Sequence, residues 1–130
     1  MNPFEVILYV ENQNISKDFY KNILEINPRL DVTGMTEFEI NPGCILGLMP
    51  YENIKNIVPQ VFNNFKKDEK FPSCELYILT DEIERKTKLA IQNGAMLLSP
   101  LEMKNWGHEV IYFSDPDKHV LAFAKIAITN

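Results

Sequence analysis

The chain carries the same order of predicted secondary-structure elements twice, namely one strand, one helix and three further strands. The first copy occupies residues 1–50 and the second occupies residues 73–130, and the start of each copy has a similar sequence, Glu-Val-Ile-Leu-Tyr-Val at 5–10 and Glu-Leu-Tyr-Ile-Leu-Thr at 75–80. Such a repeat indicates two similar modules, neither of which can cover its own sheet alone. It therefore predicts an α+β fold in which two βαβββ half-modules form a single domain.

Hydrophobic periodicity gives the element boundaries within the first copy. Residues 4–10 form a β-rich run, and a helical pattern follows that Asn14 or Ser16 could cap. Asn27-Pro28 is expected to end this helix. The remaining strands of the first copy are predicted at residues 29–33, 36–40 and 44–49.

The second copy repeats this order. A strand over residues 73–80 precedes a helix over residues 82–92, which Asn93-Gly94 is expected to stop. Residues 51–72 between the copies are polar with scattered apolar side chains, and they are predicted to form a linker that can hold one short helix. The last three strands are predicted at residues 95–103, 109–114 and 120–126.

Composition and charge limit the classes of function that the chain can have. The net charge is -5 with no large cluster of Lys and Arg, which disfavours nucleic-acid binding and suits a neutral or cationic small ligand better. No apolar run approaches about 20 residues and the N-terminal residues lack signal-peptide features, so we expect a cytoplasmic protein. Cys44 and Cys74 lie in apolar, strand-like runs, and we expect both to be reduced and buried.

Alternation along the strands assigns side chains to faces. In the first strand the apolar residues at positions 4, 6, 8 and 10 are expected to meet the helix, so Glu5, Ile7 and Tyr9 point away from it. By the same rule Glu75 and Tyr77 point away from the second helix. A concave sheet surface on that side would be an apolar ligand pocket with a few convergent polar groups. Its walls would be completed by Ile45, Met49 and Leu79.

Two carboxylates near each other in such a pocket could share a proton, which raises one pKa and produces a general base. Glu5 and Glu75 could also be solvated strand residues or partners of Lys and Arg, and the sequence leaves this open. Trp106, in the turn before the seventh predicted strand, offers a flat stacking surface at the pocket rim or a simple packing role.

Three short motifs identify the chain as similar to the glyoxalase, bleomycin-resistance and extradiol-dioxygenase superfamily, also called the vicinal oxygen chelate superfamily. They are Asp18-Phe19-Tyr20 in the first helix, Asn93-Gly94-Ala95 after the second, and Tyr112-Phe113-Ser114-Asp115-Pro116-Asp117 in the last hairpin. The resemblance implies a cupped mixed β-sheet with helices on its outer face. It also implies a homodimer, although pairing of half-modules within or between chains stays open. Lys118 replaces the glycine that usually follows this last motif, at a cost of about 1 kcal/mol if its φ is positive.

The resemblance also implies four metal-ligand positions, which fall on Glu5, Gly47, Glu75 and Ala122. Glycine and alanine have no side-chain donor atom, so the usual set of protein ligands is incomplete. The two histidines of the chain, His108 and His119, fall outside these positions.

We therefore predict no metal cofactor and a small-molecule-binding protein, with antibiotic resistance as one role that the resemblance suggests. The alternative is a glyoxalase-type lyase or isomerase that uses a divalent metal at Glu5 and Glu75, or Glu75 as general base with Glu5 as its catalytic partner. A third reading is an assembly or regulatory module. The predicted ligand-binding residues are Glu5, Ile7, Tyr9, Ile45, Gly47, Met49, Glu75, Tyr77, Trp106 and Ala122.

Overall fold

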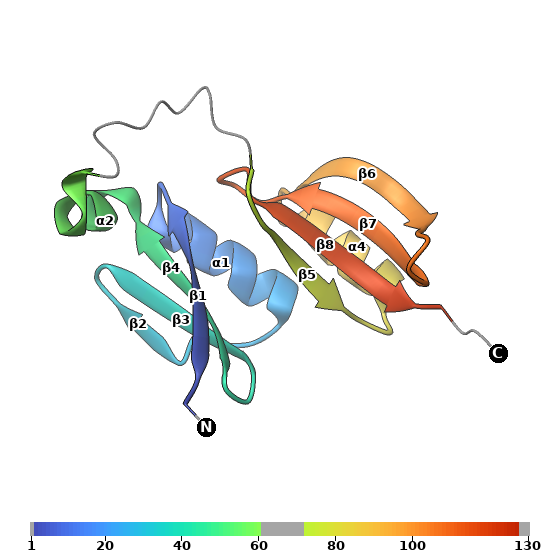
Figure 1. The fold of residues 1–130 in the computed structure, drawn as a ribbon, viewed down its shortest axis with the longest axis horizontal. Coiled ribbons are helices and arrows are strands. Elements are labelled where there is room, and N and C mark those ends of the chain that lie inside the picture. Colours follow the sequence, from blue (N-terminus) through green and yellow to red (C-terminus); the bar gives the residue numbers. More distant parts are fainter. Residues whose placement is uncertain (1, 61–71, 128–130) are drawn as a thin grey trace. The chain divides into compact units, whose positions relative to one another are not determined.

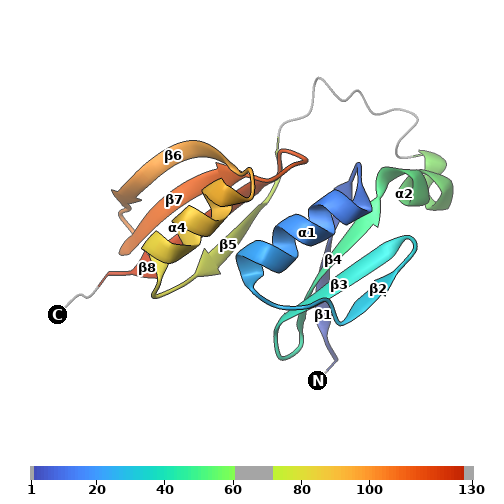
Figure 2. The same cartoon turned by 180° about the vertical axis from the view of Figure 1, so that it is seen from behind.

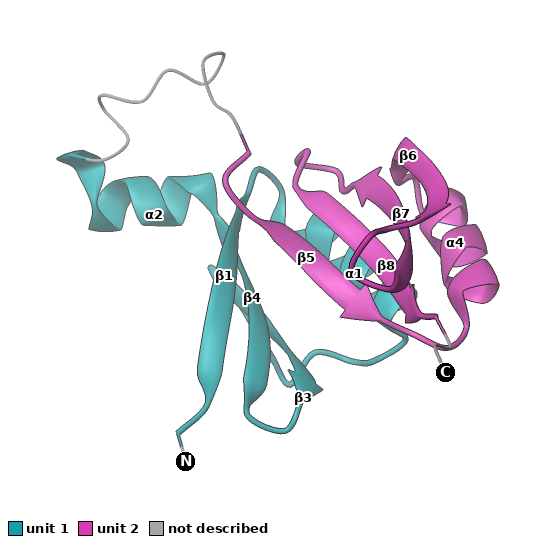
Figure 3. Ribbon diagram, turned by 45° about the vertical axis from the view of Figure 1, so that its right-hand side comes forward, with its two compact units in different colours: residues 1–70 teal, residues 71–130 magenta. Residues whose placement is uncertain are grey.

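The protein was studied as a computed structural model, which describes residues 2–60 and 72–127. The chain divides into two compact units, unit 1 over residues 1–70 and unit 2 over residues 71–130 (Figure 3). Unit 1 contains β1 (Phe4–Val10), α1 (Gln13–Leu24), β2 (Leu30–Val32), β3 (Met35–Asn41), β4 (Cys44–Pro50) and α2 (Tyr51–Ile57). Unit 2 contains β5 (Glu75–Leu79), α4 (Ile83–Gln92), β6 (Met96–Met103), β7 (His108–Ser114) and β8 (Val120–Ile126).

Each unit is built on a four-stranded mixed sheet with the same topology (Figure 1). The strand order is β1-β4-β3-β2 in unit 1 and β5-β8-β7-β6 in unit 2. In both sheets the first strand runs parallel to its neighbour, and the other pairs are antiparallel. The predicted α+β fold of two βαβββ modules is thereby confirmed. Helix α2 is the short helix predicted after residue 50, while residues 61–71 of the predicted linker lie outside the described residues.

One helix packs on one face of each sheet, α1 in unit 1 and α4 in unit 2 (Figure 2). Helix α1 contributes Phe19, Tyr20 and Ile23, each at most 3% exposed, to the core of unit 1. In unit 2 the rings of Phe113 and Phe123 are fully buried and meet edge to face, with centroids 6.4 Å apart. Each unit therefore has its own hydrophobic core between helix and sheet.

The start of helix α1 differs from the sequence expectation. Asn12 is the N-cap, and its side-chain oxygen accepts a hydrogen bond of 3.0 Å from the backbone N–H of Ile15. Ser16, one of the two predicted caps, is fully buried within the helix. The helix ends at Leu24, because Glu25 adopts a left-handed conformation with φ of 59°. Asn12 rather than Asn14 or Ser16 caps the helix, because its extended backbone places its side chain beside the first free N–H groups.

Fewer apolar residues of strand β1 are buried than alternation predicts. Leu8 and Val10 are buried, whereas Phe4 is 69% and Val6 is 37% exposed. Helix α1 packs on β3 and β4, and β1 is an edge strand, so the helix does not cover the first half of β1. The cysteine prediction fails for a similar reason: Cys44 begins β4 and Cys74 precedes β5, and both thiols are free but exposed. The helix covers the middle of a strand better than its ends, so residues at strand ends are more exposed.

The turns follow the sequence expectation more closely. Gly94 has φ of 90° after helix α4, as expected of the predicted left-handed stop. Lys118 has φ of 69°, so the predicted strain of about 1 kcal/mol applies at this position. Within the described residues, none of the helices is long and apolar enough to span a membrane.

Candidate functional site

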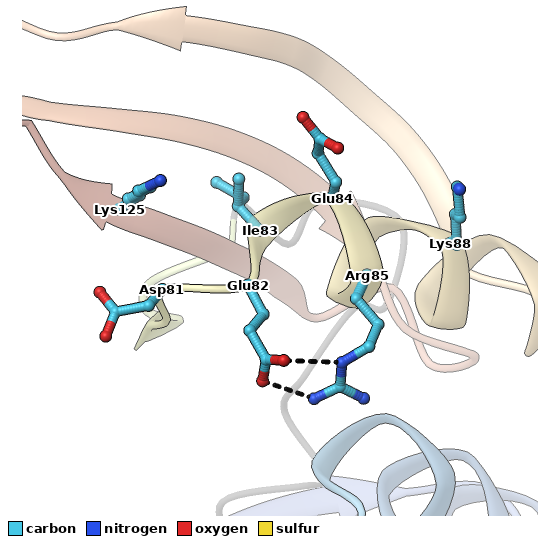
Figure 4. A pocket seen from close by; sticks show the side chains of 7 residues that line it. All are labelled: Asp81, Glu82, Ile83, Glu84, Arg85, Lys88 and Lys125. Atoms are coloured by element: carbon cyan, nitrogen blue, oxygen red, sulfur yellow. Dashed lines mark hydrogen bonds and ion pairs between the residues drawn. The ribbon is translucent and has the colours of Figure 1, made fainter.

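The sheet of unit 2 presents a row of three side chains on its face opposite α4. Ala122 of β8 pairs with Tyr77 of β5 on one side and with Tyr112 of β7 on the other. Strand alternation places Lys125 on the opposite face, and there it lines a depression together with residues of α4 (Figure 4). We call the side that carries Tyr77, Ala122 and Tyr112 the Tyr77 face.

The Tyr77 face has a buried layer of apolar residues, called its floor, beneath the side chains of Tyr77 and Tyr112. Val110, Ala122 and Ala124 are fully buried, and Tyr77 and Tyr112 pack against them. The two tyrosine side chains are partly buried and cover these three residues. This is the mixture of apolar wall and few polar groups that small-molecule sites use. The register also settles the orientation of β7, since Phe113 faces the helix side and Tyr112 the Tyr77 face.

Tyr77 is held by two hydrogen bonds from the loop and strand that follow β6. The indole Nε1 of Trp106 donates to the Tyr77 hydroxyl at 2.9 Å, and this hydroxyl lies 2.7 Å from Nδ1 of His108. The rings of Tyr77 and His108 are tilted by 32° with centroids 5.8 Å apart. Trp106 itself is 54% exposed, so its indole is tied at one edge and open to solvent over much of its surface.

Tyr112 interacts with charged side chains, namely Lys104 and Glu75. The ammonium of Lys104 lies 5.6 Å from the centroid of its ring, a cation–π contact. Burial raises the pKa of the Tyr112 phenol above its usual value of 10.0, and the negative charge of Glu75 and the proximity of Tyr77 add to the effect. Tyr112 therefore stays a neutral hydrogen-bonding group at physiological pH.

The corresponding row of unit 1 has different chemistry. Gly47 of β4 pairs with Ile7 of β1 and with Glu37 of β3. The opposite face belongs to α1, because Gln13 of that helix donates a hydrogen bond of 2.9 Å to Thr36. We call the side that carries Ile7, Glu37 and Gly47 the Gly47 face.

Glu5 occupies the space above Gly47. A Cβ atom at position 47 would collide with the Glu5 carboxylate and would lie 3.1 Å from Cγ1 of Ile7. One carboxylate oxygen of Glu5, Oε2, is buried and accepts no hydrogen bond from any described donor. The observed position of the Glu5 side chain therefore requires glycine at position 47.

The surroundings of Glu5 favour its protonated form more than water does. Burial raises the pKa of Glu5 from its ordinary value of 4.5, and the hydrogen bond to Glu37 and the charge of Glu37 raise it further, against a smaller opposing effect of Arg29. Arg29 also pairs with Glu37 at 3.1 Å and with Glu39 at 3.9 Å. Glu5 therefore takes up a proton at a higher pH than a glutamate in water.

Replacing Gly47 with alanine should lower the free energy of unfolding by about 1–3 kcal/mol, because the added methyl overpacks the contact with Glu5 and Ile7. The Glu5 carboxylate is the end of a flexible side chain, which favours the lower end of this range. In a Glu5→Ala background the cost of G47A should shrink, since the main obstacle is gone. Urea unfolding of the four variants measures this coupling, and equal costs of G47A in both backgrounds would contradict the contact.

The raised pKa of Glu5 predicts a pH dependence of stability. A raised carboxyl pKa in the folded state stabilises the protein fully below the unfolded pKa, near 4.5, and this contribution is lost as pH rises through the folded value. Glu5→Gln imitates the protonated form, so the variant should be more stable than the parent at pH 7, and the difference should vanish below pH 4.5. Thermal unfolding across this range tests it. Parallel stability curves would contradict it, and Glu37→Gln should reduce the pH dependence of the parent.

The structure divides the predicted site residues between the two units. Glu5, Ile7 and Gly47 lie on the Gly47 face, and alternation along β1 and β4 places the other predicted residues of unit 1 there as well, namely Tyr9, Ile45 and Met49. In unit 2, Tyr77 and Ala122 are neighbours on the Tyr77 face, with Glu75 on the same side of β5 and Trp106 bonded to Tyr77. The predicted pairing of Glu5 with Glu75 joins two different units and stays a prediction.

Glu37, His108 and Tyr112 contribute to these faces but were absent from the predicted site. Glu37 lies in a predicted strand, but its proximity to Glu5 depends on both strands pairing with β4. His108 lies one residue before the strand predicted at 109–114, and β7 in fact begins at His108. Its parity with Val110 and Tyr112 places it on the Tyr77 face.

The donor atoms fit the family's metal site poorly. Of the four ligand positions, Gly47 and Ala122 supply no side-chain donor, and the pKa of Glu5 is raised. A metal ligand must be deprotonated, so the raised pKa of Glu5 makes it a weaker metal ligand. The one group of potential ligands with suitable spacing among the described residues is Asp115, Asp117 and His119, none of which is one of these four positions.

That group is explained by the turn between β7 and β8. The carboxylate of Asp115 is 4% exposed, and one of its oxygens accepts hydrogen bonds from the backbone N–H groups of Asp117 and His119, at 2.9 and 2.8 Å. Its other oxygen lies 2.8 Å from Nδ1 of His119. These contacts give Asp115 and His119 a structural role in the turn.

The depression of Figure 4 lies at the start of helix α4, away from the Tyr77 face. It has a volume of about 410 Å³ and is lined by acidic and basic side chains around Ile83. Glu82 and Arg85, three residues apart at the start of α4, form an ion pair of 2.7 Å there. Exposed charged walls without a buried apolar surface are poor features for binding a small molecule.

The fold defines the chain as a protein of two βαβββ modules with the same topology. The sequence matches the glyoxalase-like domain family over residues 4–126, and the chain belongs to that family. No curated protein matches the sequence significantly.

Solved structures share the fold at low sequence identity. A glyoxalase/bleomycin resistance protein/dioxygenase family enzyme from Burkholderia phytofirmans PsJN has a TM-score of 0.83 at 11% identity, with 97% of this chain and 99% of that one covered. A glyoxalase-related enzyme from Fulvimarina pelagi has a TM-score of 0.77 at 20% identity, covering 93% and 85%. A glyoxalase/bleomycin resistance protein/dioxygenase from Nocardioides gives 0.76 at 18%, covering 100% and 86%. These similarities show the fold alone.

Proposed function

We propose that this member of the glyoxalase-like family binds a small planar molecule on the Tyr77 face without a metal ion. The observation that carries the proposal is the row of Tyr77, Ala122 and Tyr112 over a buried floor of small apolar residues, with Trp106 bonded to Tyr77 at its edge. Aromatic side chains recognise flat ligands by stacking and offer hydroxyl or N–H groups at the rim. The net charge of -5 favours a neutral or cationic ligand over an anion.

The side chains at the family's metal positions support binding without a metal. Ala122 lies under two tyrosine rings, and Gly47 lies under the carboxyl group of Glu5. In each unit the position that would supply an acid is therefore covered by another side chain. A member with this composition uses the sheet surface itself for recognition.

Trp106 provides a direct test because it is the only tryptophan in the chain. A panel of planar metabolites and antibiotics should include compounds that change its fluorescence and raise the melting temperature. A ligand at one hundred times its Kd stabilises the folded state by about 2.7 kcal/mol. Tyr77→Phe and Tyr112→Ala should weaken the response, while Glu84→Gln, in the depression beside α4, should leave it unchanged. Binding that ignores both tyrosine changes would overturn the proposed site.

A second candidate function is supported by the Glu5 and Glu37 pair. A carboxyl with a raised pKa beside a second carboxyl is a suitable general acid or base for a lyase or isomerase. This observation favours Glu5 over Glu75 as the proton carrier of such an enzyme. Elemental analysis of protein purified without chelator separates the candidates: stoichiometric metal that is lost in Glu5→Gln and Glu75→Gln would favour the metal-dependent enzyme.

Assembly and location stay predictions. We propose a homodimer in the cytoplasm, with an assembly or regulatory role as the alternative to ligand binding. Edge strand β6 exposes Met96, Leu97, Leu98, Leu101 and Met103, a composition suited to contact with another polypeptide surface. Sedimentation of the full chain measures the oligomeric state, and a monomer at all accessible concentrations would contradict the dimer.

A further inference from the structure

His108 stands at the end of a short chain of hydrogen bonds on the Tyr77 face. The Trp106 indole N–H can only donate, so the Tyr77 oxygen accepts in their bond of 2.9 Å. The same oxygen lies 2.7 Å from Nδ1 of His108. A tyrosine hydroxyl has one proton of its own, and no described side chain other than His108 lies in position to accept it.

These constraints favour one direction for the second bond. If the Tyr77 hydroxyl donates to His108, both the donor and the acceptor capacity of the hydroxyl are used. Nδ1 of His108 is then the unprotonated nitrogen, and the neutral ring carries its proton on Nε2. The opposite arrangement would leave the hydroxyl proton of Tyr77 without a partner among the described residues.

The Nε2–H of His108 is therefore an oriented donor without a partner. Among the described residues, the hydrogen bond to Tyr77 is the one polar contact of the imidazole. His108 is partly exposed, it shares its side of β7 with Val110 and Tyr112, and its ring packs at a tilt on Tyr77. A rigid donor beside an aromatic surface suits a ligand in which a hydrogen-bond acceptor projects from a flat ring.

We propose that His108 determines ligand specificity by donating its Nε2–H to a carbonyl oxygen of a neutral, planar aromatic ligand, with Tyr77 and Trp106 as the residues that position it. The proposal rests on the binding function of the Tyr77 face. A neutral carbonyl is favoured over a carboxylate because Glu75 lies on the same side of the sheet and the whole chain is acidic.

Two small probes separate the ligand classes. Benzamide presents a carbonyl oxygen beside its ring, whereas benzylamine has the same ring with a cationic group that can only donate. Titration of the full chain with each probe, followed by NMR of the aromatic and histidine signals, should show preferential binding of benzamide. The signals of Tyr77, Trp106 and His108 should move, while those of His119, in the turn after β7, should stay in place.

Two substitutions test the nitrogen assignment. His108→Asn keeps a polar atom near the position of Nδ1 and removes Nε2, whereas His108→Gln places an amide nitrogen near the position of Nε2. One lost hydrogen bond corresponds to about tenfold, so benzamide should bind about tenfold more weakly to H108N and within about threefold of the parent to H108Q. Long-range 15N–1H spectra of the two histidines should show an Nε2–H ring for His108 that becomes a mixture of tautomers in Tyr77→Phe.

The outcomes distinguish the two levels of the account. If neither probe moves any signal of the Tyr77 face, the binding function fails and the role of His108 fails with it. If benzamide binds but H108N leaves its affinity unchanged, if benzylamine binds as tightly, or if His108 carries its proton on Nδ1, the role of His108 is wrong while binding at the face stands.

Discussion

Replacing Phe123 with alanine should lower the free energy of unfolding by about 3–5 kcal/mol, the usual cost of removing a buried aromatic ring. Phe123 is fully buried on β8, and its ring meets Phe113 edge to face at 6.4 Å. Helix α4 packs on β8, so the cavity would open in the contact between helix and sheet. Since β8 also carries Ala122 and Ala124, the substitution should loosen the floor of the Tyr77 face as well.

Phe4→Ala is the matched control for this prediction. It removes the same side chain from β1, where the ring is 69% exposed, and should change stability by no more than about 0.5 kcal/mol. Urea unfolding followed by circular dichroism and by Trp106 fluorescence gives the two free energies. A loss below about 1 kcal/mol for Phe123→Ala would contradict the core of unit 2 described above.

Asp115→Ala should destabilise unit 2 by about 2–4 kcal/mol, because it leaves two backbone N–H groups and the His119 ring without their acceptor. The carboxylate is 4% exposed, so water cannot readily replace it. The turn it holds also contains Lys118 with φ of 69°, a conformation that is unfavourable for lysine and depends on the surrounding contacts.

Asp115→Asn separates the contributions to this loss. The amide oxygen can still accept from the backbone N–H groups of Asp117 and His119, while the charge beside the imidazole is gone. We expect a smaller loss than for alanine. Lys118→Gly in the parent should raise stability by about 1 kcal/mol, because glycine adopts positive φ without strain. Equal losses for D115A and D115N would show that the backbone bonds contribute little.

The sequence predicted the fold because its signals are local. Alternation and turn residues such as Asn93-Gly94 locate elements from neighbouring positions, and the repeat then gives both modules the same topology. The predictions were wrong where several residues could act as the helix cap, and where residues lie at the end of a strand. Asn12, Asn14 and Ser16 all suit an N-cap by type, and backbone geometry selects Asn12. Cys44 looks buried by its neighbours, yet it begins its strand beyond the helix.

The site was predicted in part, since strand parity orders residues along one strand and cannot show which strands are neighbours. Parity placed Glu5 and Tyr77 on the faces opposite the helices. The contact of Glu5 with Glu37 requires both of their strands to flank β4. The link from Tyr77 to His108 likewise requires β5 and β7 to flank β8. Neither contact leaves a pattern in the linear sequence.

The central claim is that a small planar molecule binds on the Tyr77 face without a metal ion. Its most direct test is a titration of chelator-treated protein with benzamide and with the best compound of the ligand panel, followed by Trp106 fluorescence and by NMR. The account predicts saturable changes at Tyr77, Trp106 and Tyr112 that stay the same when a divalent metal is added. Binding that appears only after metal is added, or that leaves the signals of these three residues unchanged, would contradict it.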